Sequence, residues 1–127
     1  MRLLLDTHAF LWFVGGDERL GRRARRALEA DDAELVLSAA SVWEMAIKAG
    51  LGRLTLPSPV EQYVAEKLAA GFELLPVEWY HAARVERLPL HHRDPFDRLL
   101  AAQALSERLP LVTSDLVFKR YGVKTIG

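Results

Sequence analysis

Short runs of apolar residues recur along the chain, and each is followed by a segment with helical patterning. The runs at residues 2–5, 34–38 and 111–113 are almost continuously apolar instead of alternating with polar residues. A strand of that kind is buried on both faces, as in parallel sheets that are covered by helices on both sides. The sequence therefore predicts an α/β fold with a central parallel sheet of about five short strands, flanked by helices on both faces.

No internal repeat, low-complexity tract or flexible linker interrupts the 127 residues, so we expect a single domain spanning residues 1–127. The expected strands are residues 2–5, 34–38, 72–75, 111–113 and 123–126. The expected helices are residues 9–14, 19–30, 41–49, 78–87, 96–108 and 115–120. One more helix is expected to open with Ser58 as its cap, Pro59 at its first position and Glu61 completing a capping box.

The composition excludes several classes of function. The chain has no cysteine, so disulfides, thiolate zinc sites and cysteine nucleophiles are ruled out. Basic and acidic residues number 17 each, which argues against a general nucleic-acid coating protein but not against an enzyme that acts on nucleic acid. Neither a Gly-x-Gly-x-x-Gly motif nor a P-loop occurs, so no nucleotide cofactor is expected. Without a signal peptide or membrane-spanning run, the expected location is cytoplasmic.

Four acidic residues stand where a strand gives way to a helix or inside the first turn of a helix: Asp6, Glu44, Asp97 and Asp115. In an open α/β sheet these positions gather at the carboxyl ends of the strands, where ligands bind. Carboxylates brought together there repel by roughly 3 kcal/mol per pair, at ~5 Å and an effective dielectric of ~20. A hard divalent cation held by oxygen ligands is the simplest compensation, and this predicts a metal-dependent hydrolase.

Each acid also has a purely structural interpretation. Asp6 and Asp115 are in place to cap helices, and Glu44 stands three residues after Ser41, which is the spacing of a capping box. Asp97 stands three residues after Asp94 in the same arrangement. Capping alone does not require an acid at every such transition, because serine, threonine and asparagine cap equally well. The four acids together therefore favour the metal site.

The sequence blocks around the acids resemble the signature blocks of PIN-domain ribonucleases, and most of all the VapC-type toxins of type II toxin–antitoxin pairs. The blocks are Leu3-Leu4-Leu5-Asp6-Thr7-His8, Ser41-Val42-Trp43-Glu44, Asp94-Pro95-Phe96-Asp97 and Leu111-Val112-Thr113-Ser114-Asp115, in the family's order and spacing. The resemblance implies that the four acids bind one or two Mg²⁺ or Mn²⁺ ions and that Thr113 supports them. It further implies hydrolysis of RNA, inhibition by a small antitoxin protein, and a homodimer.

Several nearby residues have open assignments. Asp94 either caps the following helix or touches the metal. Lys48, Arg93 and Arg98 either contact substrate phosphates or neutralise the acids when no metal is bound. His8 is expected to point away from the site, and His91 and His92 to face solvent in a loop. The Arg22–Arg26 run is interpreted as a solvated helix face.

Two other functions remain as alternatives to the toxin. One is a housekeeping PIN nuclease that trims RNA and has no antitoxin, and the other is a non-catalytic PIN module that binds metal or RNA. A phosphoacceptor receiver domain is disfavoured, because only Asp6 follows the first strand where such domains need paired acids.

Overall fold

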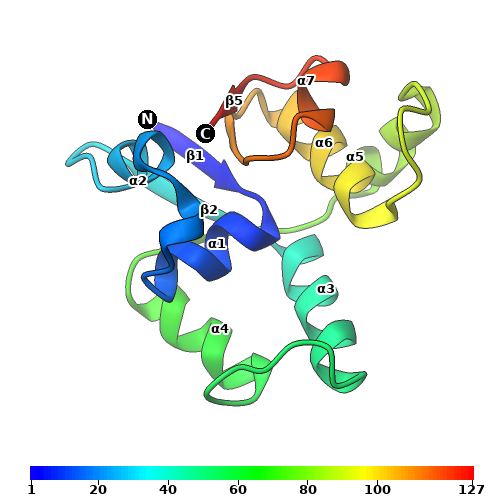
Figure 1. The fold of residues 1–127 in the computed structure, drawn as a ribbon. Coiled ribbons are helices and arrows are strands. Elements are labelled where there is room, and N and C mark those ends of the chain that lie inside the picture. Colours follow the sequence, from blue (N-terminus) through cyan, green and yellow to red (C-terminus); the bar gives the residue numbers. More distant parts are fainter.

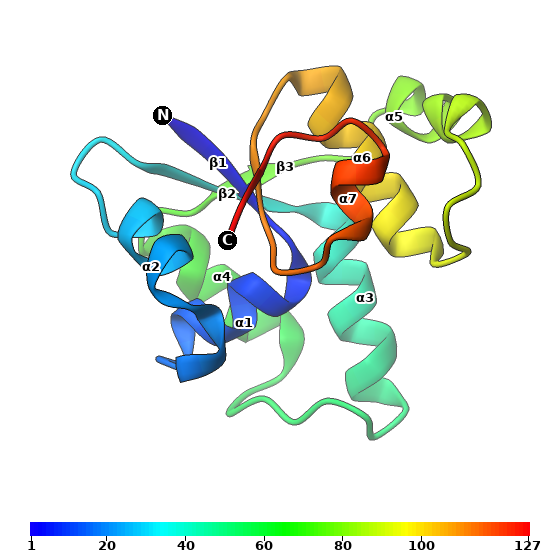
Figure 2. The same cartoon turned by 45° about the horizontal axis from the view of Figure 1, so that its top comes forward.

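The predicted parallel sheet is present at the centre of the molecule (Figures 1 and 2). Its strand order is β3-β2-β1-β4-β5. A computed structural model describes residues 1–127. The strands are β1 (Arg2–Leu5), β2 (Glu34–Ser38), β3 (Glu73–Leu75), β4 (Leu111–Val112) and β5 (Thr125–Ile126). All four neighbouring pairs are parallel. The α/β fold with five short strands is therefore confirmed.

Seven α-helices and two 3-10 turns connect the strands. The helices are α1 (Thr7–Val14), α2 (Arg22–Leu28), α3 (Ala39–Gly50), α4 (Val60–Ala69), α5 (Trp79–Arg84), α6 (Pro95–Glu107) and α7 (Val117–Arg120). The 3-10 turns are η1 (Glu18–Leu20) and η2 (Val85–Arg87). No helix is long and apolar enough to cross a membrane.

Helices cover both faces of the sheet, as predicted, because successive residues of a strand point to opposite faces. Leu3 and Leu5 of β1 pack with buried residues of α1, α2, α3 and α4. Leu4, between them, packs on the other face with buried residues of α6 and α7. All three leucines are buried, which explains why β1 is apolar throughout.

The residues predicted as one helix at 19–30 form two elements. Gly21 has a φ of 83°, a left-handed conformation that glycine adopts without steric strain, and it separates η1 from α2. The exposed Arg22, Arg23 and Arg26 on α2 agree with the predicted solvated face. The helix expected from Glu78 to Arg87 likewise divides into α5 and η2.

Two predicted caps are wrong. Helix α3 begins at Ala39, with the side chain of Ser38 accepting a hydrogen bond from the backbone N–H of Ala40, so Ser41 is not its cap. Helix α4 begins at Val60 with Pro59 as its cap residue, and the buried Ser58 hydroxyl makes no hydrogen bond. Helix α3 therefore begins two residues before Ser41, and helix α4 begins one residue after Pro59, which was expected in its first position.

Candidate active site

The four predicted acids line one cleft at the carboxyl edge of the sheet. The cleft has a volume of about 110 Å³ and no hydrophobic residue in its lining. Its walls are Asp6, Thr7, His8, Glu44, Lys48, Asp94, Asp97, Ser114 and Asp115. The chain after β1 and the chain after β4 meet there because these strands are neighbours at the centre of the sheet. This is the point where the strand order reverses, the usual ligand site of open α/β sheets.

Asp6 holds the first turn of α1 and also faces the cleft. Its Oδ1 accepts a hydrogen bond from the backbone N–H of Ala9 at 2.7 Å, so the capping interpretation is correct for this residue. Its Oδ2 accepts one from the Thr113 hydroxyl at 2.5 Å. Burial raises the pKa of Asp6, and the nearby charge of Asp115 raises it further, against the lowering effect of the two hydrogen bonds. Asp6 therefore caps the helix and still presents a carboxyl group with a raised pKa to the cleft.

Thr113 joins the two acids at the centre of the sheet. While its hydroxyl donates to Asp6, the same oxygen accepts a hydrogen bond from the backbone N–H of Asp115 at 3.0 Å. Asp115 Oδ1 accepts one from the N–H of Val117 at 3.0 Å, which orders the turn that leads into α7. The supporting position of Thr113 that the resemblance implied thus corresponds to a direct contact with both acids.

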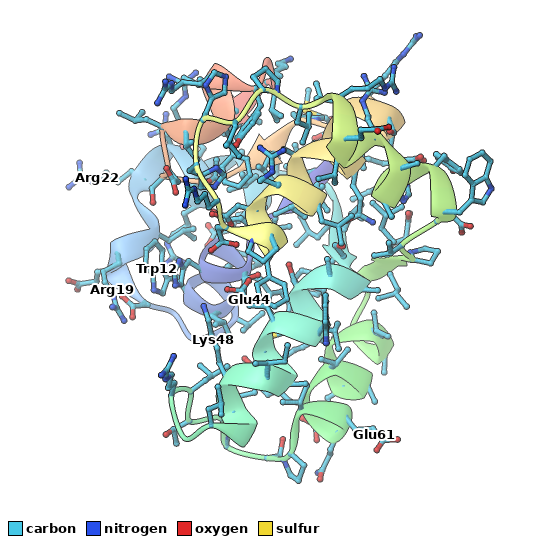
Figure 3. All side chains as sticks on the ribbon, turned by 90° about the vertical axis from the view of Figure 1, so that its right-hand side faces the viewer. Trp12, Arg19, Arg22, Glu44, Lys48 and Glu61 are labelled. Atoms are coloured by element: carbon cyan, nitrogen blue, oxygen red, sulfur yellow. The ribbon has the colours of Figure 1, made fainter.

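Glu44 lies in the second turn of α3, where both of its carboxylate oxygens have partners. Lys48, one turn further along, places Nζ 2.5 Å from Oε2, and the two side chains are labelled in Figure 3. The Thr7 hydroxyl lies 2.7 Å from Oε1 and 2.9 Å from the Ser41 hydroxyl. An ionised carboxylate only accepts, so Thr7 donates its single proton to Glu44 and accepts from Ser41. Ser41, the supposed cap, therefore supports Glu44 through Thr7.

Asp97 is in the first turn of α6, and Asp94 is the cap of that helix. The backbone N–H of Asp97 donates to Asp94 Oδ1 at 3.0 Å. Burial raises the pKa of Asp97 to about 6, and the charges of Asp94 and Glu44 contribute, while a hydrogen bond with His92 opposes the shift. Buried Gln103, later on α6, bonds to Ser38 and to the carbonyl of Pro76, which fixes α6 against the ends of β2 and β3.

The donor set of the cleft fits a hard divalent cation. Apart from His8, every candidate ligand is an oxygen, five carboxylates face the space, and Lys48 is the single lysine or arginine among its walls. No three acidic or histidine side chains are close enough to hold one ion jointly in this conformation. Mg²⁺ is usually held by only one or two carboxylates and otherwise by water, so a closer cluster is not required. The pKa values of Asp6 and Asp97 are raised because their ionised forms are unfavourable in the cleft. A bound cation would stabilise those ionised forms.

The three basic residues with open assignments have different positions. Lys48 lines the cleft and pairs with Glu44. Arg98 is not part of the lining, because its guanidinium donates to the carbonyls of Val85, Leu88 and Pro89. Arg93 is exposed and does not line the cleft either. Of the three, only Lys48 lines the cleft.

The histidines are placed differently from the predictions. His8 lines the cleft, and its ring stacks on that of Trp12 at 5.5 Å between centroids. The guanidinium of Arg19 lies over the Trp12 ring in turn, 5.3 Å from its centroid, and both of these side chains are labelled in Figure 3. His91 and His92 do not simply face solvent, because both rings pack against Tyr121. Of the three, only His8 could have been placed near the site from the sequence, because it follows Asp6, the cap of α1, by two residues.

Comparison with known proteins identifies the family of the chain. The family model of the PIN domain matches residues 3–124. The chain is 34% identical over 114 residues to the ribonuclease VapC22 of Mycobacterium tuberculosis, covering 89% of this chain and 86% of that protein. The resemblance that the sequence blocks predicted is thereby confirmed.

Solved structures show the same fold. The DNA-bound VapBC of Salmonella typhimurium matches with a TM-score of 0.71 at 17% identity, over 98% of this chain and 96% of that one. VapBC2 of Rickettsia felis, bound to a DNA fragment from its promoter, matches with a TM-score of 0.70 at 18% identity, over 98% and 97%. The chain belongs to the PIN-domain family, and within that family it is similar to VapC-type proteins.

Proposed function

We propose that this protein is a Mg²⁺- or Mn²⁺-dependent endoribonuclease and the toxin of a toxin–antitoxin pair. The observation that carries the proposal is the single cleft in which Asp6, Glu44, Asp97 and Asp115 meet at the reversal point of the sheet. The similarity to the ribonuclease VapC22 supports RNA as the substrate. The net charge of zero is compatible, since affinity for a phosphodiester would come from the bound cation and from Lys48 at the cleft.

Asp6 and Asp97 are the proposed direct ligands, and Glu44 and Asp115 complete the shell directly or through water. One or two bound ions would activate a water molecule as the nucleophile and would stabilise negative charge on the phosphoryl group. The chain's own residues hold this arrangement in place. Thr113 fixes Asp6 and the backbone of Asp115, and Thr7 fixes Glu44. Lys48 balances the charge of Glu44 and lies within reach of a phosphate that enters the cleft.

A small antitoxin is the proposed protein partner. The solved relatives from Salmonella and Rickettsia are VapBC complexes, and VapC22 is similar over most of the chain. Helix α3 exposes Trp43 and Ile47 at helical spacing, followed by Leu51, with 57%, 37% and 63% of each residue accessible. Such an apolar stripe is typical of a surface that a protein partner covers. A homodimer is proposed from the family resemblance.

The decisive test is cleavage of total cellular RNA by the purified protein with Mn²⁺, with Mg²⁺ and with EDTA. We expect metal-dependent cuts that disappear in Asp6→Asn and Asp97→Asn. The matched control is Asp31→Asn, because Asp31 is exposed and lies outside the cleft. If Asp6→Asn cleaved RNA as fast as the parent, the proposed function would be wrong. Mapping the ends of the fragments would identify the target.

A further inference from the structure

His92 lies between Tyr121 and the cleft acid Asp97. Its Nδ1 is 2.7 Å from the Tyr121 hydroxyl oxygen, and its Nε2 is 3.3 Å from Oδ2 of Asp97. Arg98 approaches the same hydroxyl from another side, with Nη1 at 3.1 Å. Arg98, Tyr121, His92 and Asp97 thus form one chain of hydrogen bonds that ends at the candidate metal site.

The hydrogen bonds around Tyr121 determine which nitrogen of His92 carries the proton. The hydroxyl oxygen accepts from Nη1 of Arg98 and from the backbone N–H of His92, the latter at 3.3 Å. Its own proton therefore goes to Nδ1 of His92, which acts as the acceptor. A neutral imidazole that accepts at Nδ1 carries its proton on Nε2. The Nε2–H group consequently donates to Asp97.

This donor constrains one oxygen of the Asp97 carboxylate and leaves the other available. Oδ2 is held by His92, whereas no side chain or backbone group of the protein donates to Oδ1. The Nε2–H donor orients the carboxylate through Oδ2 and leaves Oδ1 facing the cleft. Groups that hydrogen-bond a ligating carboxylate in this way typically govern metal affinity.

Arg98 also fixes the segment that carries His92. Its guanidinium donates to the carbonyl oxygens of Val85, Leu88 and Pro89, at 2.9 to 3.4 Å. It also lies over the Tyr121 ring, 5.8 Å from the centroid. The residues between η2 and α6 have no regular secondary structure, so these contacts hold His92 against both Tyr121 and Asp97.

We infer that His92 is a positioning residue, held in one tautomer by Tyr121 and Arg98, that presents Oδ1 of Asp97 to a divalent cation. This role deepens the proposed function and rests on it. It also assigns Arg98 to the support of the site, in place of the contact with substrate phosphate that the sequence left open.

The first test is the Mn²⁺ affinity of the purified protein by isothermal titration calorimetry, which needs no RNA. His92→Leu should weaken binding by about 10- to 100-fold. His92→Gln should recover part of the loss, because its amide keeps a donor near the position of Nε2. Tyr121→Phe, which removes only the hydroxyl, should also weaken binding. His91→Leu is the matched control and should bind as the parent does, since His91 touches the Tyr121 ring but no acid.

The second test is the tautomer itself, read from the imidazole nitrogen signals of ¹⁵N-labelled protein by NMR. We expect the Nε2–H form of His92 in the parent and a mixture of tautomers in Tyr121→Phe. An Nδ1–H form in the parent would overturn the inference. Equal Mn²⁺ affinity in the parent, His92→Leu and Tyr121→Phe would overturn it while leaving the proposed metal site intact. A parent protein that binds no Mn²⁺ would overturn the inference and the proposed function together.

Discussion

At the scale of single residues, Asp97 shows the conflict between burial and charge most clearly. Its side chain is 27% exposed, it faces Glu44 across the cleft, and Asp94 lies one helical turn before it. The folded protein therefore favours the protonated form of Asp97 up to a pH of about 6. A bound cation would reverse that preference, so proton and metal compete for the same carboxylate.

The raised pKa of Asp97 predicts the pH dependence of stability in EDTA, where no divalent cation is bound. Because the folded pKa of Asp97 is raised from 3.8 to about 6, its favourable contribution is complete below pH 3.8 and is lost as the pH rises through 6. The loss should be roughly 1–2 kcal/mol once solvent screening is allowed for. Urea unfolding between pH 4 and pH 7 measures it, and Asp97→Asn should flatten the curve. An equally steep curve in Asp97→Asn would contradict the prediction.

Thr113 is the second residue whose removal should be costly. Thr113→Val deletes the donor to buried Asp6 and the acceptor for the N–H of Asp115, for an expected loss of about 1.5–3 kcal/mol. Thr113→Ser keeps the hydroxyl and should retain most of the stability and of the RNA cleavage. Thermal unfolding of the two variants, beside the exposed control Thr55→Val, makes the comparison. A Thr113→Val protein as stable as Thr113→Ser would show that the hydroxyl is not needed.

At the scale of elements, the starts of α1 and α6 both serve the cleft. Asp6 caps α1 and belongs to the site, whereas Asp94 caps α6 so that Asp97 one turn later reaches the site. Acids are also favoured at these helix ends by the positive end of the helix dipole. The structural and catalytic interpretations of these acids are therefore compatible, because the same backbone geometry satisfies both.

Asp94 allows the two interpretations to be separated experimentally. Asp94→Ala should cost about 1 kcal/mol through loss of the cap, whereas Asp94→Asn keeps the cap and should leave stability nearly unchanged. Asp94→Asn should also lower the pKa of Asp97, because the charge of Asp94 raises it. Calorimetry with Mn²⁺ then decides the remaining question. A loss of affinity above about tenfold in Asp94→Asn would identify Asp94 as a metal ligand instead of a cap alone.

The elements that the sequence predicted correctly are those with a local signal. Apolar runs marked the strands, and the Asp94-Pro95 pair marked the start of α6. The caps at Ser41 and Ser58 were predicted wrongly because nearby residues of the same chain can also cap the helix, and the motif alone does not choose between them. Thr7 and His92 were not recognised as supports of the site. Their partners Glu44 and Tyr121 are 37 and 29 positions away in the sequence, so only the folded chain brings them together.

At the scale of the whole molecule, a cation in the cleft would tie together β1, α3, α6 and the segment after β4. Binding to the folded state alone raises the free energy of unfolding by about 2.7 kcal/mol at a hundredfold excess over Kd. For a domain of this size, the melting temperature should rise on the order of 10 °C. Scanning calorimetry with and without Mn²⁺ measures this increase. Asp6→Asn should show a much smaller increase, and an unchanged one would remove Asp6 from the ligand set.

The position of β1 at the centre of the sheet has a consequence for synthesis. The hydrogen bond from Thr113 to Asp6 spans 107 positions of the chain, so Asp6 is made long before its partner. β1 gains its second neighbour only when β4 has been made and has docked beside it. Contacts of such long range form late and carry a large entropic cost of closure. A nascent chain thus carries Asp6 and Glu44 long before β4 and Asp115 complete the cleft, so the site cannot form until that part of the chain has been made.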